Sequence, residues 1–97
     1  MAGRLKGKVA VISGGATGMG GAASRLFAAE GAKVAIVDRN SEAGEATAAE
    51  IRANGDEAAF FAADVSDEGQ VNAAVAAASE RFGAATVLFN RNYPPPI

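Results

Sequence analysis

The chain has 97 residues, of which 49% are hydrophobic and 21% charged, and its formal net charge is −2. This size and composition predict one small globular domain, and the scattered lysines and arginines exclude a basic footprint for nucleic acid or anionic membrane surfaces. Cysteine and histidine are both absent, which excludes disulfides, thiol nucleophiles, zinc clusters and histidine-dependent catalytic triads.

Strand-like and helix-like segments alternate along the chain. In order, they predict a strand at 8–13, a helix at 18–30, a strand at 33–38, a helix at 41–54, a strand at 57–63, a helix at 67–82 and a strand at 86–90. Ser41 and Asp67 are expected N-caps, and Gln70 stands at capping-box spacing from Asp67. Glycines are expected to end the helices, namely Gly31, Gly55 and Gly83.

Apolar stripes indicate which face of each helix should be buried. In the first helix, Ala22, Leu26 and Ala29 share one face, which we expect to pack on the core, while Arg25 and Glu30 lie off it. The third helix has a similar stripe, made of Val71, Ala74, Val75 and Ala78.

The alternation predicts an α/β fold of the Rossmann type, with helices on both faces of a partial parallel sheet of about four strands. A fourth strand placed beside the first would open a crevice at the carboxyl ends of the strands, where cofactors bind in such folds. Residues 1–90 are therefore expected to form a nucleotide-binding half-domain, followed by a proline-rich tail at 91–97. No apolar run is long enough to cross a membrane, so we expect a soluble cytoplasmic protein.

A glycine-rich turn follows the first predicted strand. Gly14, Gly18 and Gly20 are expected to shape a phosphate-binding turn at a helix N-terminus, because glycine lets a pyrophosphate approach the backbone closely. Ala16, Thr17 and Met19 would line that turn. The alternative is a flexible turn with no ligand, since a lone glycine pattern is weak evidence.

Asp38 ends the second predicted strand, 20 positions after Gly18 (38 − 18). An acid at about this distance binds the ribose hydroxyls in dinucleotide folds. The alternative reading is a solvated acid at the end of a strand.

The chain resembles the N-terminal part of the short-chain dehydrogenase/reductase superfamily. The family's Thr-Gly-x-x-x-Gly-x-Gly signature stands here at 13–20, with Ser13 in the threonine position, and the opening at 5–10 is also typical. The resemblance implies a nicotinamide dinucleotide as cofactor and assigns Asp38 to the ribose. Since a 2′-phosphate would be repelled by that carboxylate, NAD is favoured over NADP, although Arg39 could partly offset the repulsion.

Two further positions match the family locally. Asp64 and Val65 resemble the pair that contacts adenine, and the alternative is an acid preceding a helix beside a core valine. Asn90 matches the first residue of the family's Asn-Asn-Ala-Gly motif and would lie near the middle of the cofactor.

The resemblance ends after Asn90, where Arg91 and Tyr93 replace the small residues of that motif. The family's catalytic serine and Tyr-x-x-x-Lys pair have no counterpart in the sequence, so no catalytic residue is assigned. We therefore expect a cofactor-binding fragment without turnover, with 91–97 as a non-family tail of a truncated or frame-shifted reading frame. An uncovered fourth strand predicts self-association.

Two other functions remain open at this point. One is a non-catalytic nucleotide-binding module that regulates a partner. The other is a methyltransferase-like half-fold, since those proteins also combine a glycine turn with an acid that ends the second strand; the glycine spacing fits the dehydrogenase pattern better.

Overall fold

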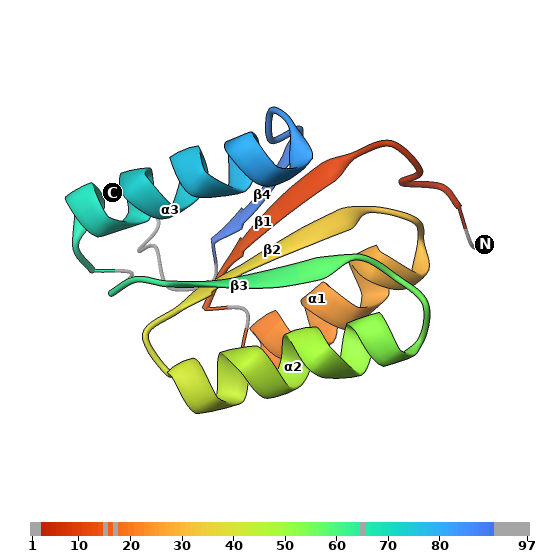
Figure 1. The fold of residues 1–97 in the computed structure, drawn as a ribbon, viewed down its shortest axis with the longest axis horizontal. Coiled ribbons are helices and arrows are strands. Elements are labelled where there is room, and N and C mark those ends of the chain that lie inside the picture. Colours follow the sequence, from red (N-terminus) through yellow and green to blue (C-terminus); the bar gives the residue numbers. More distant parts are fainter. Residues whose placement is uncertain (1–2, 15, 17, 65, 91–97) are drawn as a thin grey trace.

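A computed structural model describes residues 3–14, 16, 18–64 and 66–90, with the backbone alone at 87–90. Strands and helices alternate in the predicted order (Figure 1), which confirms the α/β class. The elements are β1 (Val9–Ser13), α1 (Gly18–Ala29), β2 (Lys33–Asp38), α2 (Ser41–Ala53), β3 (Ala58–Ala62), α3 (Glu68–Phe82) and β4 (Val87–Asn90).

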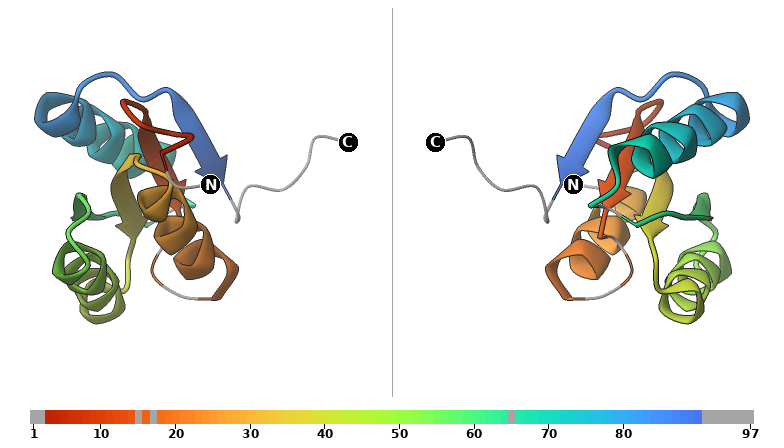
Figure 2. Two further views of the ribbon diagram at one scale, coloured as in Figure 1. Left: turned by 90° about the vertical axis from the view of Figure 1, so that its right-hand side faces the viewer. Right: turned by 90° about the vertical axis from the view of Figure 1, so that its left-hand side faces the viewer.

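The strands form one parallel sheet in the order β3-β2-β1-β4. The chain moves outward from β1 to β3 and then crosses back, through α3, to the other side of β1. Helices α1 and α2 cover one face of the sheet and α3 covers the other (Figure 2). The strand order thus reverses between β1 and β4, and ligands bind at the carboxyl ends of strands at such a point.

The two central strands form the core. Every residue of β1 is buried, as are the four middle residues of β2, because a parallel sheet covered on both faces has no solvent side. Alternate residues serve opposite layers: Ile12 and Ile36 belong to the cluster under α1 and α2, while Val11 and Val37 belong to the cluster under α3.

The helix ends agree with the predicted stops and with one of the two predicted N-caps. Gly31, Gly55 and Gly83 all adopt positive φ, and Asp67 caps α3 by accepting from the Gln70 N–H at 3.1 Å. The expected cap of α2 was wrong by one residue, because Asn40, not Ser41, accepts from the Ala43 N–H at 3.0 Å. Asn is among the strongest N-cap residues and has the β-region backbone that a cap requires.

The predicted inner face of α1 was also wrong. Ala22, Ala29 and Leu26 are exposed, Leu26 by 56%. The buried face consists of small residues, namely Gly20, Gly21, Ser24 and Ala28. The reason is close packing, since a Cβ at Gly21 would lie 3.2 Å from the Ala16 carbonyl oxygen. In α3 the predicted stripe is confirmed: Ala74 and Ala78 are buried, and Val71 and Val75 are half-buried.

Glu30, expected off the core face, is buried against Arg4. Its carboxylate accepts from the Arg4 backbone N–H at 3.3 Å and from Arg4 Nε at 3.5 Å. Burial opposes ionisation most strongly of the single effects, but these bonds together with nearby positive charge, including that of Arg4, outweigh it and hold the pKa of Glu30 below its ordinary value. The contact ties the segment before β1 to the end of α1.

Within the ranges that the structure describes, no helix has the length and apolarity needed to cross a bilayer. The tail predicted at 91–97 lies outside those ranges.

Candidate cofactor-binding site

The carboxyl ends of the parallel strands bring the candidate residues to one edge of the sheet. Gly14 follows β1, Asp38 ends β2, and Asp64 follows β3. Asn90 ends β4, where its backbone pairs with Ser13. Thr17 and Val65, together with the side chain of Asn90, lie outside the described residues.

The glycine turn and Asp38, 22 residues from Ala16, are joined by hydrogen bonds. The Ala16 N–H donates to Asp38 Oδ2 at 3.3 Å, and the Gly14 N–H donates to the Val37 carbonyl at 2.7 Å. Both amides are therefore used in attaching the turn to the end of β2. The predicted spacing does place the acid beside the glycine turn.

The first turn of α1 lies at this edge of the sheet and presents backbone amides other than those of Gly14 and Ala16. Gly14 and Gly18 have positive φ, 70° and 58°, so each stands where a side chain would be strained. Helix geometry leaves the N–H groups of Gly18, Met19 and Gly20 without a carbonyl partner inside α1, and the helix dipole adds partial positive charge there. Met19 is 65% exposed beside Gly20, which is buried. Such an arrangement can hold an anion.

Asp38 is held in place from two sides. Its Oδ1 accepts from the Asn40 N–H at 3.0 Å, while Oδ2 accepts from Ala16. A carboxylate offers about four lone-pair sites, so each oxygen keeps acceptor capacity toward solvent. The half-exposed carboxylate can therefore accept bonds from a pair of ligand hydroxyls.

Asp64 has its own shell of donors. Its Oδ1 accepts from the Ser66 hydroxyl at 2.7 Å and from the Ser66 N–H at 3.0 Å. These two bonds lower the pKa of Asp64, partial burial opposes them, and the Arg39 guanidinium adds to the lowering. The carboxylate is therefore ionised at neutral pH.

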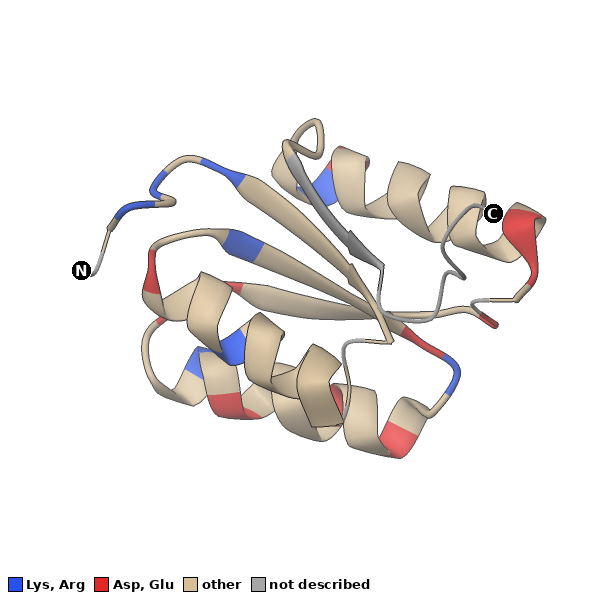
Figure 3. Cartoon of the chain, turned by 180° about the vertical axis from the view of Figure 1, so that it is seen from behind, with Lys and Arg blue, Asp and Glu red and all other residues tan. Residues whose placement is uncertain are grey.

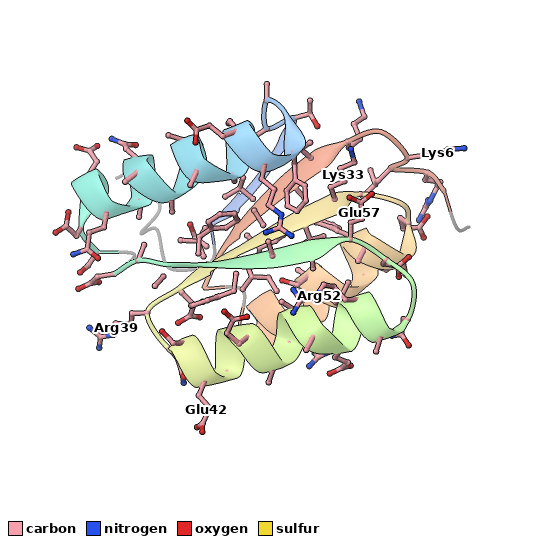
Figure 4. All side chains as sticks on the ribbon, in the orientation of Figure 1. Lys6, Lys33, Arg39, Glu42, Arg52 and Glu57 are labelled. Carbon is pink, nitrogen blue, oxygen red and sulfur yellow. The ribbon has the colours of Figure 1, made fainter. Side chains whose placement is uncertain are left out.

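Arg39 is paired with Asp64, whose Oδ2 lies 3.7 Å from Arg39 Nη1. The Arg39 side chain is 78% exposed and extends outward from the end of β2 (Figure 4). An exposed pair at this distance is weak. Arg39 is thus engaged with an acid of the neighbouring loop.

Sequence reasoning missed two residues that support this edge. Gln70 Oε1 accepts from the Asp64 N–H at 2.8 Å, and Gln70 Nε2 donates to Asp67 Oδ2 at 3.3 Å. Its side-chain oxygen therefore binds the backbone of the Asp64 loop and not the backbone N–H of Asp67, as a capping box would require. Thr47 of α2 donates from its hydroxyl to the Ala16 carbonyl at 2.7 Å. The available signal for Thr47 was a hydroxyl on the otherwise small and apolar buried face of α2.

Charge is unevenly distributed between the two ends of the sheet. Acidic residues predominate in the turns and first helical turns that follow β2 and β3 (Figure 3); they are Asp38, Glu42, Asp64, Asp67 and Glu68, with Arg39 as the base among them. Lys6 and Lys33 lie at the opposite end, near Glu57 (Figure 4). Among the described residues, no group of three His, Cys, Asp or Glu side chains could hold a metal ion.

Comparisons with known proteins found similar sequences and a similar fold. Residues 8–92 match the family model described as short chain dehydrogenase. Over 90 residues the chain is 53% identical to 2,5-dichloro-2,5-cyclohexadiene-1,4-diol dehydrogenase LinX of Sphingobium indicum. It is 44% identical over 89 residues to D-threitol dehydrogenase of Mycolicibacterium smegmatis.

A solved structure shares the fold. The citronellol catabolism dehydrogenase AtuB of Pseudomonas aeruginosa PAO1 aligns with a TM-score of 0.89 and 32% identity over 100% of this chain and 41% of its own. The matches cover 93% of this chain but 36% of the LinX protein, and 90% but 34% of D-threitol dehydrogenase. The chain thus spans about a third of the length of these curated relatives.

Proposed function

The chain belongs to the short-chain dehydrogenase family, and we propose that it binds NAD at the carboxyl edge of its sheet. The observation that carries the proposal is the hydrogen bond from the Ala16 N–H to Asp38 Oδ2 at 3.3 Å. This bond unites an anion-binding helix start with a ribose-binding acid, which are the two halves of a dinucleotide site.

The pyrophosphate would bind at the N-terminus of α1, on the amides of Gly18, Met19 and Gly20. Gly14 and Ala16 would act differently, because their own N–H groups already donate to Val37 and Asp38. Their role in the proposal is to shape and anchor the turn. Thr17 is proposed to line the same turn.

NAD is proposed over NADP. The Asp38 carboxylate would accept from the two ribose hydroxyls, whereas the 2′-phosphate of NADP would meet that carboxylate and the surrounding acidic residues. Arg39 could offset part of this repulsion, because its guanidinium is exposed and only weakly paired with Asp64.

The adenine ring would lie between β2 and β3, against Asp64 and Val65. One Asp64 oxygen, Oδ1, accepts from Ser66, and Oδ2 lies 3.7 Å from the exposed Arg39 guanidinium. Oδ2 makes the weaker contact and is the acceptor proposed for the adenine amino group. Asn90, at the end of β4 and beside β1, is proposed to lie near the middle of the cofactor.

The reaction proposed for the complete family protein is oxidation of an alcohol to a carbonyl, for which NAD, when bound, would supply the hydride acceptor. The names of LinX and D-threitol dehydrogenase describe alcohol substrates of those proteins. Here the 97 residues contain no histidine and no Tyr-x-x-x-Lys. We therefore propose that this chain supplies the cofactor site and by itself catalyses no hydride transfer.

Calorimetric titration with NADH, and separately with NADPH, tests the proposal. Asp38→Asn removes one charge and nearly preserves the shape of the side chain. We expect it to weaken NADH binding about tenfold or more, the usual effect of losing a charged hydrogen-bond acceptor. We also expect it to reduce the ratio of NADH affinity to NADPH affinity. Glu57→Gln, which removes a charge at the opposite end of the sheet, should leave both affinities unchanged.

The outcomes separate the candidate functions. Equal weakening of NADH and NADPH by Asp38→Asn would mean that Asp38 only supports the loop. A folded chain that binds neither dinucleotide would overturn the proposal, and displacement of NADH by S-adenosylmethionine would favour a methyltransferase-like site.

A further inference from the structure

Thr47 occupies an unusual place in α2. It is 4% exposed and shares the inner face of the helix with Gly44, Ala48 and Ile51. A threonine hydroxyl within a helix commonly bonds to a carbonyl in the preceding turn of its own helix. The Thr47 hydroxyl has a single proton and donates it to Ala16, 31 residues earlier, at 2.7 Å.

The Ala16 residue is therefore held by three separate elements. Its N–H donates to Asp38 at the end of β2, and its carbonyl oxygen accepts from Thr47 of α2. The same oxygen packs closely against Gly21 of α1, where an added Cβ would lie 3.2 Å from it. Ala16 itself is 3% exposed. These contacts determine the direction in which the chain enters α1, two residues before the helix begins.

The direction of the Ala16 carbonyl matters for an anionic ligand. A carbonyl oxygen carries partial negative charge, and one turned toward a bound pyrophosphate would repel it. Thr47 supplies a donor inside the protein, so the oxygen is kept in the interior while the first amides of α1 remain available to the anion.

We propose that Thr47 is a positioning residue for the pyrophosphate-binding turn. It acts through Ala16, without touching the cofactor, and the inference rests on the proposed function of the site. Without its hydroxyl the buried Ala16 carbonyl would have to find another donor or leave the interior, and the turn would lose its binding geometry.

Three variants test the inference by NADH titration. Thr47→Val keeps the branched shape and removes the hydroxyl, which leaves the buried Ala16 acceptor unpaired. Because the turn would then shift from its binding geometry, we expect the NADH affinity to fall about fivefold or more. Thr47→Ser keeps the hydroxyl and should restore most of the affinity. Ile51→Val shortens a neighbouring buried residue of the same helix, which packs in the core under α1 and α2, and should leave the affinity unchanged.

A second readout needs no cofactor. Amide hydrogen exchange at Ala16, compared with Val34 in the core, should speed up in Thr47→Val and not in Thr47→Ser or Ile51→Val. If the wild-type chain binds NADH and neither affinity nor Ala16 exchange distinguishes Thr47→Val from Ile51→Val, the inference is wrong. If the wild-type chain binds no NADH, the proposed function is wrong, and so is the role of Thr47 in cofactor binding. Faster exchange of the Ala16 amide in Thr47→Val would in that case show that Thr47 anchors the turn and has no effect on a cofactor.

Discussion

At the scale of single residues, the carboxylates of this edge differ in what surrounds them. Asp38 accepts from two backbone amides of different loops, Ala16 and Asn40, and so links the glycine turn to the start of α2. Asp64 accepts two hydrogen bonds from Ser66, and its contact with the loop after β2 is the weak ion pair with Arg39. Asp38 therefore joins segments distant in sequence, whereas Asp64 orders its own turn.

The lowered pKa of Asp64 predicts how the stability of the fold depends on pH. The ordinary pKa of 3.8 applies in the unfolded chain, and the folded pKa is lower. The group therefore contributes stability above about pH 4 that is lost as the pH falls through the lower folded value. Ser66→Ala removes the hydroxyl bond and should raise the pKa of Asp64, measured by NMR titration of its carboxyl carbon.

Arg39→Gln is the matched comparison for that titration. Arg39 is exposed and 3.7 Å from the carboxylate, so water screens most of its effect. Its removal should raise the pKa of Asp64 less than Ser66→Ala does. A larger rise in Arg39→Gln would show that the ion pair, and not the turn, keeps the carboxylate charged.

At the scale of elements, small residues let the helices approach the sheet. Gly21 brings α1 against the glycine turn, and Gly44 brings α2 against the ring of Phe60 in β3. At these two points the packing of α1 and α2 depends on a close approach that a glycine allows.

Gly44→Ala tests this close approach. An added Cβ would overlap the Phe60 ring, and overpacking of about 1–3 kcal/mol should exceed the roughly 1 kcal/mol of helix propensity gained. We expect the free energy of unfolding, measured by urea denaturation, to fall by up to about 2 kcal/mol.

Gly69→Ala is the control, since the site on α3 is exposed and an added Cβ there would make ordinary contact with Asp67 at 3.4 Å. It should raise the free energy of unfolding by up to about 1 kcal/mol. Stabilisation by both variants would contradict the role assigned to Gly44.

At the scale of the whole molecule, β4 lies at one end of the sheet order and pairs with β1 alone among the described strands. An edge strand presents unpaired N–H and C=O groups that can pair with another chain. This edge adjoins the crossover between β1 and β4, so contacts made there would also lie close to the proposed cofactor site.

We predict that the chain self-associates through β4. Sedimentation equilibrium over a wide concentration range should show an average mass that rises with concentration and returns to the monomer value on dilution. A constant monomer mass together with a sharp, concentration-independent melting transition would contradict this prediction.

The alternation of strands and helices and the position of Asp38 after the glycine turn could be predicted from the sequence, because they depend on local patterns and on a spacing set by one strand-helix-strand unit. The inner face of α1 and the cap of α2 could not. Periodicity identifies a stripe of apolar residues, but the contact with Ala16 decided that the glycine face of α1, and not the Leu26 stripe, packs inward.

The amino-acid sequence by itself determined the kind of fold and which end of the sheet carries the candidate residues. Only the tertiary structure decided how the site is held together. The bond between Thr47 and Ala16 spans 31 residues, and that between Ala16 and Asp38 spans 22. Contacts of this kind depend on how α2 packs beside the glycine turn, and no local pattern of residues encodes that packing.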